Sequence, residues 1–201
     1  MIKRRFVLIN MLVFMLIISL TVGCVENNET SNEQEETSSV LLTVIFGGYQ
    51  ANYTLGDIEA LEAYTGTGAY IKTKFLPESV VTDDIHEYTG VLMTTFLEQI
   101  PALPENYTIS VISSDGWTTN YTLNEILGYV DVYNETGNLS SSERAVVMIL
   151  AYKEDGSYYS EIDPENETGP LRIAFVGDNP IYTPSDLWAK MVVSIEVISQ
   201  Q

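Results

Sequence analysis

The side chains that most often carry chemistry in proteins, the cysteine thiol and the histidine imidazole, each occur once in the 201-residue chain, at Cys24 and His86. A metal site needs three or four ligands, so one histidine beside Asp83, Asp84 and Glu87 indicates an exposed histidine and not a metal centre. No cysteine follows Cys24, which excludes a disulfide framework and a thiolate metal site from the rest of the chain. We also find no Ser/His/Asp set, nucleophile elbow or phosphate loop. The sequence therefore predicts no catalytic residue and no metal ligand.

Cys24 lies at the end of an export signal. Residues 3–5 are basic, residues 6–22 are almost wholly apolar, and a small residue precedes the cysteine. Residues 20–24 resemble a lipobox, in which cleavage before the cysteine frees its sulfur for lipid attachment. An uncleaved signal anchor is the alternative, and both interpretations place the rest of the chain outside. We expect residues 1–23 to be a signal peptide, and lipid on Cys24 to tether the protein to the outer face of the cytoplasmic membrane.

Asparagine occurs often in the Asn-x-Ser/Thr pattern, the acceptor for N-glycosylation. Chance would give about two or three such sites in a chain of this composition. Glycosylation outside the cell would explain the excess, and together with the lipobox and the acidic balance it is typical of an archaeal surface protein. The predicted glycosylation sites are Asn28, Asn52, Asn106, Asn120, Asn134, Asn138 and Asn166.

The exported part is strongly acidic. The whole chain has a net charge of −19, and the three basic residues of the leader are among its nine Lys and Arg residues. Such a surface repels nucleic acid and anionic lipid, so we exclude nucleic-acid binding. Residues 24–39 combine the anchor with a polar, acidic stretch that cannot bury enough apolar surface to become ordered, which predicts a flexible tether. Residues 40–201 have the length and composition of one domain with a core.

The elements of this domain are short strands with a few capped helices. Thr54 with Asp57, and Thr122 with Glu125, show the spacing of a capping box at a helix start. A third helix is expected within residues 92–100. Strands dominate, so the predicted class is α+β with about three short helices. Strands are predicted at residues 40–46, 70–75, 107–113, 117–121, 145–152, 171–176 and 191–198, with loops at 160–169 and 177–184.

Six segments of the domain follow one another in an order that matches a known family. They are the strand at residues 40–46 with Gly47 ahead of Tyr-Thr-Leu at 53–55, Tyr-Thr-Gly-Val-Leu at 88–92 ahead of Thr-Phe-Leu at 95–97, Ser-Asp-Gly-Trp at 114–117, the apolar run 147–152 ahead of Asp-Gly at 155–156, Gly-Pro-Leu-Arg at 169–172, and Trp-Ala-Lys at 188–190 ahead of a β-branched strand. Together they resemble the oxidoreductase molybdopterin-binding domain. The resemblance implies a single sulfite-oxidase-type mixed β domain.

In catalytic members of that family a cysteine thiolate binds molybdenum. The corresponding stretch here, residues 70–75, contains no cysteine, which argues against the redox reaction because soft thiolate ligation is how the protein holds the metal. Molybdopterin also carries phosphate, which needs basic partners. By resemblance, the candidate cofactor-binding residues are Lys72, Lys74, Arg172 and Lys190. The alternatives are two solvent-facing lysines on a strand edge, and an Arg172 paired with a carboxylate.

These observations favour a cell-surface lipoprotein whose molybdopterin-binding-like domain is a non-catalytic binding or accessory module. Its cofactor is molybdopterin by resemblance only, or none. Its expected partners are the membrane, through the lipid anchor, and a small molecule or protein at the cell surface. Two alternatives remain: a molybdopterin-dependent oxidoreductase without a cysteine ligand, and a structural protein of the cell envelope.

Overall fold

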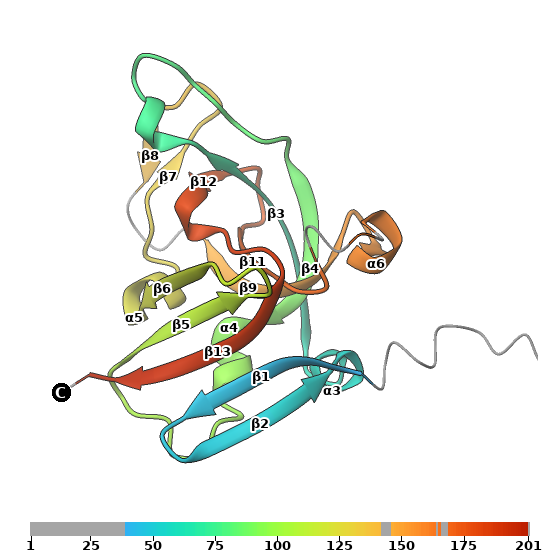
Figure 1. Ribbon diagram of the computed structural model, residues 1–201. Helices are drawn as coiled ribbons and strands as arrows, with labels where there is room; N and C mark the ends of the chain where they lie inside the picture. Colours follow the sequence, from blue (N-terminus) through green and yellow to red (C-terminus); the bar gives the residue numbers. More distant parts are fainter. Residues whose placement is uncertain (1–38, 142–145, 164, 166–168, 201) are drawn as a thin grey trace, which may run out of the picture. The chain divides into compact units, whose positions relative to one another are not determined.

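Residues 39–141, 146–163, 165 and 169–200 are described by the computed structural model of the chain. A five-stranded sheet with the order β2-β1-β13-β5-β6 forms one layer of the fold (Figure 1). β1 runs parallel to β13, and the other neighbours in this sheet are antiparallel. Its strands are β1 (Val40–Phe46), β2 (Tyr49–Thr54), β5 (Tyr107–Ser113), β6 (Thr118–Thr122) and β13 (Val192–Ser199).

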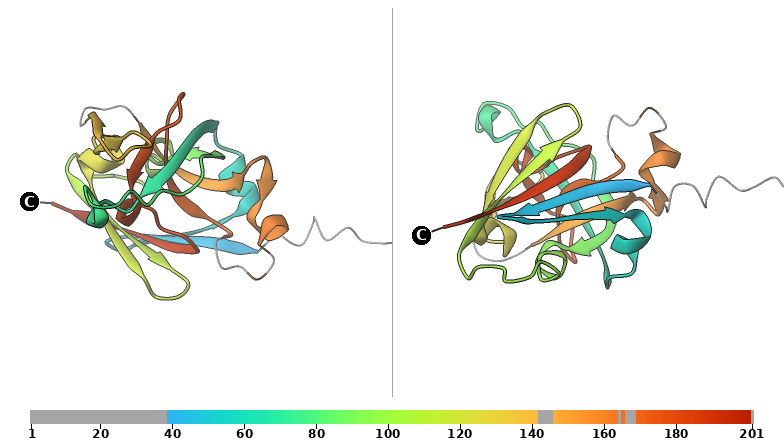
Figure 2. Two further views of the ribbon diagram at one scale, coloured as in Figure 1. Left: turned by 90° about the horizontal axis from the view of Figure 1, so that it is seen from above. Right: turned by 60° about the horizontal axis from the view of Figure 1, so that its bottom comes forward.

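The second sheet has the order β10-β9-β4-β3-β12-β7-β8. Outside this order, β11 pairs with β9 on the side away from β4. The sheet combines antiparallel pairs with one parallel pair, β3 with β12. Two further views show β1, β2 and β13 side by side, apart from the strands of this sheet (Figure 2). Its strands are β3 (Ala63–Ile71), β4 (His86–Leu92), β7 (Val132–Tyr133), β8 (Leu139–Ser141), β9 (Val147–Glu154), β10 (Ser157–Tyr158), β11 (Arg172–Val176) and β12 (Tyr182–Pro184).

Short helices connect the strands. Both predicted capping boxes are confirmed: Thr54 caps α3 with Asp57, and Thr122 caps α5 with Glu125. No helix in the described part of the chain is long and apolar enough to cross a membrane. The helices are α3 (Leu55–Glu59), α4 (Met93–Leu97), α5 (Leu123–Ile126) and α6 (Tyr159–Ile162), with 3-10 turns η1 (Thr73–Phe75) and η2 (Ser185–Leu187).

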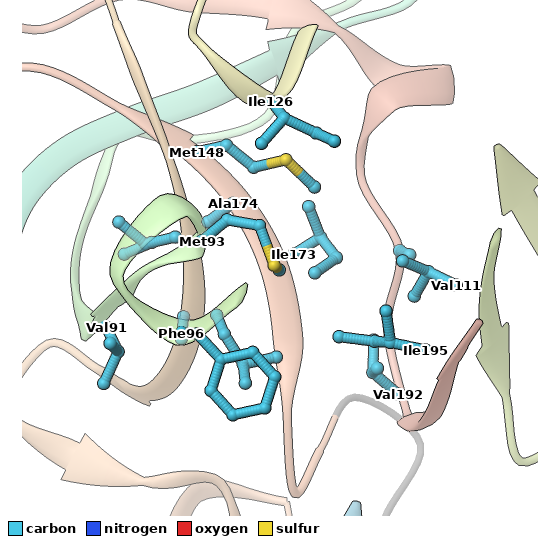
Figure 3. Close-up of a cluster of buried hydrophobic side chains, with 14 of the residues drawn as sticks. Val91, Met93, Phe96, Val111, Ile126, Met148, Ile173, Ala174, Val192 and Ile195 are labelled. Carbon is cyan, nitrogen blue, oxygen red and sulfur yellow. The ribbon is translucent and has the colours of Figure 1, made fainter. Parts of the chain in front are cut away.

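The main hydrophobic core lies between the two sheets, with α4 inserted at its side (Figure 3). Val111 and Ile195 enter it from the five-stranded sheet, and Met148 and Ile173 enter it from the second sheet. Phe96 of α4 is fully buried there, with its ring centre 5.0 Å from that of Tyr53. Burial of a large apolar side chain contributes about 1.5–3 kcal/mol, so this layer supplies much of the stability that holds the loops in place.

The structure confirms the α+β class and corrects several element boundaries. The segment predicted as a strand at 70–75 contains only the end of β3, followed by η1, and the predicted loops at 160–169 and 177–184 contain α6 and β12. The segment ahead of α4 is itself a strand, β4. Gly90 lies there because a Cβ at this position would be 2.3 Å from the backbone oxygen of Leu150 on β9. Close backbone approach of this kind depends on a partner that is distant in sequence.

Candidate binding pocket

A cavity of about 580 Å³ opens beside the ends of β3, β4, β9 and β11. Strand pairing brings these ends together: β3 pairs with β4, β4 with β9, and β9 with β11. The volume is within the usual range of small-molecule pockets, about 300–1,000 Å³. The lining residues are Tyr70, Asp83, His86, Glu154, Asp155, Ser157, Ile162, Asp163, Arg172 and Lys190.

Arg172 is the buried cation of this cavity. It is the first residue of β11, and only 2% of its surface is exposed. Its Nη1 donates a hydrogen bond to Glu154 Oε2 at 3.0 Å. Its Nε and Nη2 are fully buried and have no hydrogen-bond partner among the described residues, although the Tyr159 hydroxyl lies near enough to raise the pKa of the guanidinium. These two nitrogens form the side of the guanidinium that binds a carboxylate or another oxyanion through two parallel hydrogen bonds.

Two aromatic rings hold this guanidinium in place. The central carbon of Arg172 lies 5.4 Å from the ring centre of Tyr88 and 5.1 Å from that of Trp188. The two rings meet edge to face at 5.3 Å, and Trp188 Nε1 donates to the hydroxyl of Thr183. Burial disfavours the charged form of Arg172, but the oxygens of Tyr88, Tyr159 and Glu154 raise its pKa overall. The cation therefore stays charged and is held between the two rings.

His86 lies at the edge of the cavity in a hydrogen-bonded pair with Asp155. Nδ1 of His86 is 2.7 Å from Asp155 Oδ2, and the other oxygen of Asp155 accepts from the backbone N–H of Glu87. The hydrogen bond with Asp155 raises the pKa of His86, and the same hydrogen bond lowers the pKa of Asp155. The pair connects the start of β4 to the β9–β10 turn. The sequence predicted an exposed histidine; the side chain is 29% exposed, and its partner could not be foreseen because Asp155 is 69 positions away in sequence.

Carboxylates outnumber cations in the cavity. Asp83, Glu154, Asp155 and Asp163 line it, against Arg172, Lys190 and His86, whose pKa is raised by its hydrogen bond to Asp155. Lys190 is exposed overall, but partial burial and then the charge of Arg172 lower the pKa of its ammonium group. Among the described residues, no group of three or more His, Cys, Asp or Glu side chains is placed to hold a metal ion. The cavity is open and polar, but its charge is mixed and not basic.

The four candidate cofactor-binding residues separate into two pairs. Arg172 and Lys190 line the cavity, from positions far apart in the sequence. Lys72 precedes η1 and is half-buried outside the cavity, and Lys74 is exposed with its ammonium 5.0 Å from the ring centre of Phe75. The ion pair weighed for Arg172 is present, with Glu154 as its partner. The ion pair with Glu154 and contact with an anionic ligand are therefore compatible, because the ion pair uses only one side of the guanidinium.

The modification sites are placed as follows. Cys24, Asn28 and Asn166 lie outside the described residues. The other five predicted glycosylation sites all have exposed asparagines. They are Asn52 on β2, Asn106 just before β5, Asn120 on β6, and Asn134 and Asn138 in the turn between β7 and β8.

Comparison with known proteins establishes the fold alone. No protein-family model and no curated protein matches the chain. Among solved structures, the sulfane dehydrogenase SoxCD from Paracoccus pantotrophus is similar, with a TM-score of 0.54 and 13% sequence identity over 79% of this chain. The match covers only 38% of that protein's chain. The domain therefore has a mixed α+β fold of the sulfite-oxidase type, as the order of its sequence segments predicted.

The residues of the cavity do not fit a molybdenum cofactor. No cysteine follows Cys24, so a thiolate ligand is lacking. The cofactor's phosphate would face four carboxylates, with Arg172 and Lys190 as the only lysine or arginine side chains among the described residues that line the cavity. One side of Arg172 is already used by Glu154. No step of a redox reaction follows from these side chains.

Sequence reasoning missed the acidic half of the pocket. Glu154 ends β9 and Asp155 begins the turn after it, where the sequence was interpreted only as a turn, and Asp163 lies in a predicted acidic loop. The sequence did contain one indication: Glu154 is the first carboxylate after the apolar residues 147–152, so it lies where the strand leaves the core. Which cation it meets depends on β11 pairing with β9, and that pairing is not visible in the local pattern.

Proposed function

We propose that the chain is an exported binding protein, tethered by lipid at Cys24 to the outer face of the cytoplasmic membrane and glycosylated on its surface asparagines. Its domain uses the sulfite-oxidase-type fold to bind a small molecule and does not catalyse a redox reaction. The unpaired side of the buried Arg172 carries the proposal. A buried donor without a partner costs about 1–3 kcal/mol, which a ligand oxygen would recover.

The charges of the cavity support a ligand that is not a simple anion. An oxyanion placed on Arg172 Nε and Nη2 would also meet the surrounding carboxylates, which raises the energy of an ion that has only negative charge. A zwitterion avoids this conflict, because its carboxylate binds Arg172 and its ammonium group faces carboxylates such as Asp83. Amino acids and related small zwitterions are therefore the proposed ligand class.

Calorimetric titration of the full chain in detergent tests this function. The probes are amino acids, dicarboxylates and diamines, each titrated into the wild type, R172K and the control K74Q. Lysine keeps the charge of Arg172 but cannot form two parallel hydrogen bonds. We expect saturable binding of at least one zwitterion, an affinity about tenfold or more weaker in R172K, which corresponds to about 1.4 kcal/mol, and no change in K74Q.

The proposal fails if no zwitterion binds saturably, or if R172K binds as tightly as the wild type. Thermal unfolding of R172K shows whether the variant is folded at the temperature of the titration. If it is not, the variant K190Q gives a second test, because this exposed residue lines the same cavity and its loss should weaken binding without unfolding the domain.

A second candidate function is a molybdopterin-dependent oxidoreductase that holds its cofactor without a cysteine. The fold supports it, and so does the presence in one cavity of two candidate residues that were taken from the family resemblance, Arg172 and Lys190. This candidate requires a bound metal in the native protein, whereas the binding protein does not. The metal content of native material therefore separates the two.

A further inference from the structure

The two sheets differ in how long their terminal strands are. β10 and β8, at the ends of the second sheet's order, have two and three residues, and the five-residue β11, which pairs with β9 outside that order, is buried along its whole length. β2 and β6, at the ends of the five-stranded sheet, have six and five residues (Figure 1). A short terminal strand gives another chain little to pair with, whereas a long one presents a row of backbone donors and acceptors. The five-stranded sheet therefore needs another means to prevent association through its edges.

Two of the usual means, charged residues and proline, are missing from both of these strands. β2 reads Tyr-Gln-Ala-Asn-Tyr-Thr and β6 reads Thr-Thr-Asn-Tyr-Thr, so neither contains a charged residue or a proline. β6 is in regular register with β5 over all five of its residues. β2 is in regular register with β1 from Tyr49 to Tyr53, and the one irregularity lies at the Val40 end of the pair. Lysine, proline and bulges are the common protections of edge strands.

Each strand instead carries one exposed asparagine of a glycosylation site, Asn52 on β2 and Asn120 on β6. The hydroxyl of Thr43, on the neighbouring strand, donates to Asn52 Oδ1 at 3.1 Å, so this bond does not use the amide nitrogen, the atom that would carry the glycan. A strand added beside β2 or β6 would place a side chain about 5 Å from the asparagine. A glycan on that asparagine would occupy the same space.

We propose that glycans on Asn52 and Asn120 protect the two long edges of the five-stranded sheet from pairing with a second copy of the chain. This inference rests on the proposed export and glycosylation, but not on the ligand in the cavity. It assigns these two sites a role that the other sites do not share. Asn106 lies in an identical Asn-Tyr-Thr tripeptide, but β5, which it precedes, is an internal strand.

The test compares four forms of the full chain made in a host that glycosylates exported proteins: wild type, N52Q/N120Q, N106Q and N52K/N120K. Thr54 and Thr122 are left unchanged because both also cap helices. Mass spectrometry reports which sites carry glycan. Size-exclusion chromatography with light scattering, in one detergent for all forms, reports the protein mass of each particle.

We expect Asn52 and Asn120 to carry glycan, and N52Q/N120Q to form particles of at least twice the monomer mass. Wild type and N106Q stay monomeric, and N52K/N120K does too, since lysine restores protection by charge without a glycan. Unoccupied sites would overturn both glycosylation and this inference. If the sites are occupied and N52Q/N120Q is monomeric, the inference alone is overturned. Association of N52K/N120K would also overturn it, because the association would then come from a fold defect and not from an unprotected edge.

Discussion

The two sheets of the domain have different tasks. The five-stranded sheet contributes no described residue to the lining of the Arg172 cavity, and its two irregularities of register lie at the starts of β1 and β13. The second sheet contains a bulged pairing between β4 and β9, very short terminal strands and a buried arginine at one end. One sheet thus serves mainly as a rigid wall of the core, and the other carries the polar site. Stability and binding should therefore respond to different substitutions.

The largest expected effect is in the core that the sheets share. Replacing Phe96 by alanine should lower the free energy of unfolding by about 3–5 kcal/mol, because its fully buried ring leaves a cavity. Urea denaturation measures the change. F75A is the control: Phe75 is 40% exposed, so its loss should change stability by about 0.5 kcal/mol or less. Equal effects of the two substitutions would contradict the assignment of the core.

The next effect tests whether the polar site contributes to stability. In E154L the buried Arg172 loses the carboxylate partner that it has among the described residues, which should cost about 3 kcal/mol. The double variant E154L/R172M removes both charges and should recover most of that loss, while ligand binding is abolished. Denaturation and calorimetry on the same samples measure both quantities. A double variant as unstable as E154L would show that the arginine stabilises the fold by its packing.

A smaller effect concerns the two strand-to-helix joints. Asp57 and Glu125 each accept a hydrogen bond from the backbone N–H of a capping threonine, so D57A and E125A should each lower stability by about 0.5–1 kcal/mol. The exposed Glu135 gives the control, E135A, with no expected change. Thermal unfolding with matched glycosylation compares them. Clearly unequal losses would mean that the repeated Asn-Tyr-Thr-Leu sequence does not form equivalent joints.

The smallest effect is pH dependence at the cavity edge. The hydrogen bond to Asp155 raises the pKa of His86 above 6.5, so its stabilisation is complete below that pH and is lost as the pH rises through the folded-state pKa. Because the pair is partly exposed, the change should be below about 1 kcal/mol. Denaturation at pH 5.5 and pH 8 should show a stability advantage of wild type over H86Q that is larger at the lower pH. An equal difference at both values would contradict the pairing.

Sequence patterns predicted the five-stranded sheet better than the site. β1 and β5 occur at the predicted residues, because alternating burial depends on neighbours two positions apart. The capping boxes were equally local. β12 and β4 were missed, since their strand character depends on pairing with β3 and β9. The family resemblance indicated Arg172 and Lys190, but only the folded chain shows that Glu154 neutralises part of the cavity while one side of Arg172 stays unpaired.

The metal content of the native protein tests the central claim most directly. That claim is that a sulfite-oxidase-type fold without a thiolate ligand serves here as a binding site centred on Arg172. Elemental analysis of full-length protein, purified from the organism that makes it, should find neither molybdenum nor tungsten in stoichiometric amount. One tightly bound molybdenum or tungsten atom per chain would contradict the account and restore the oxidoreductase.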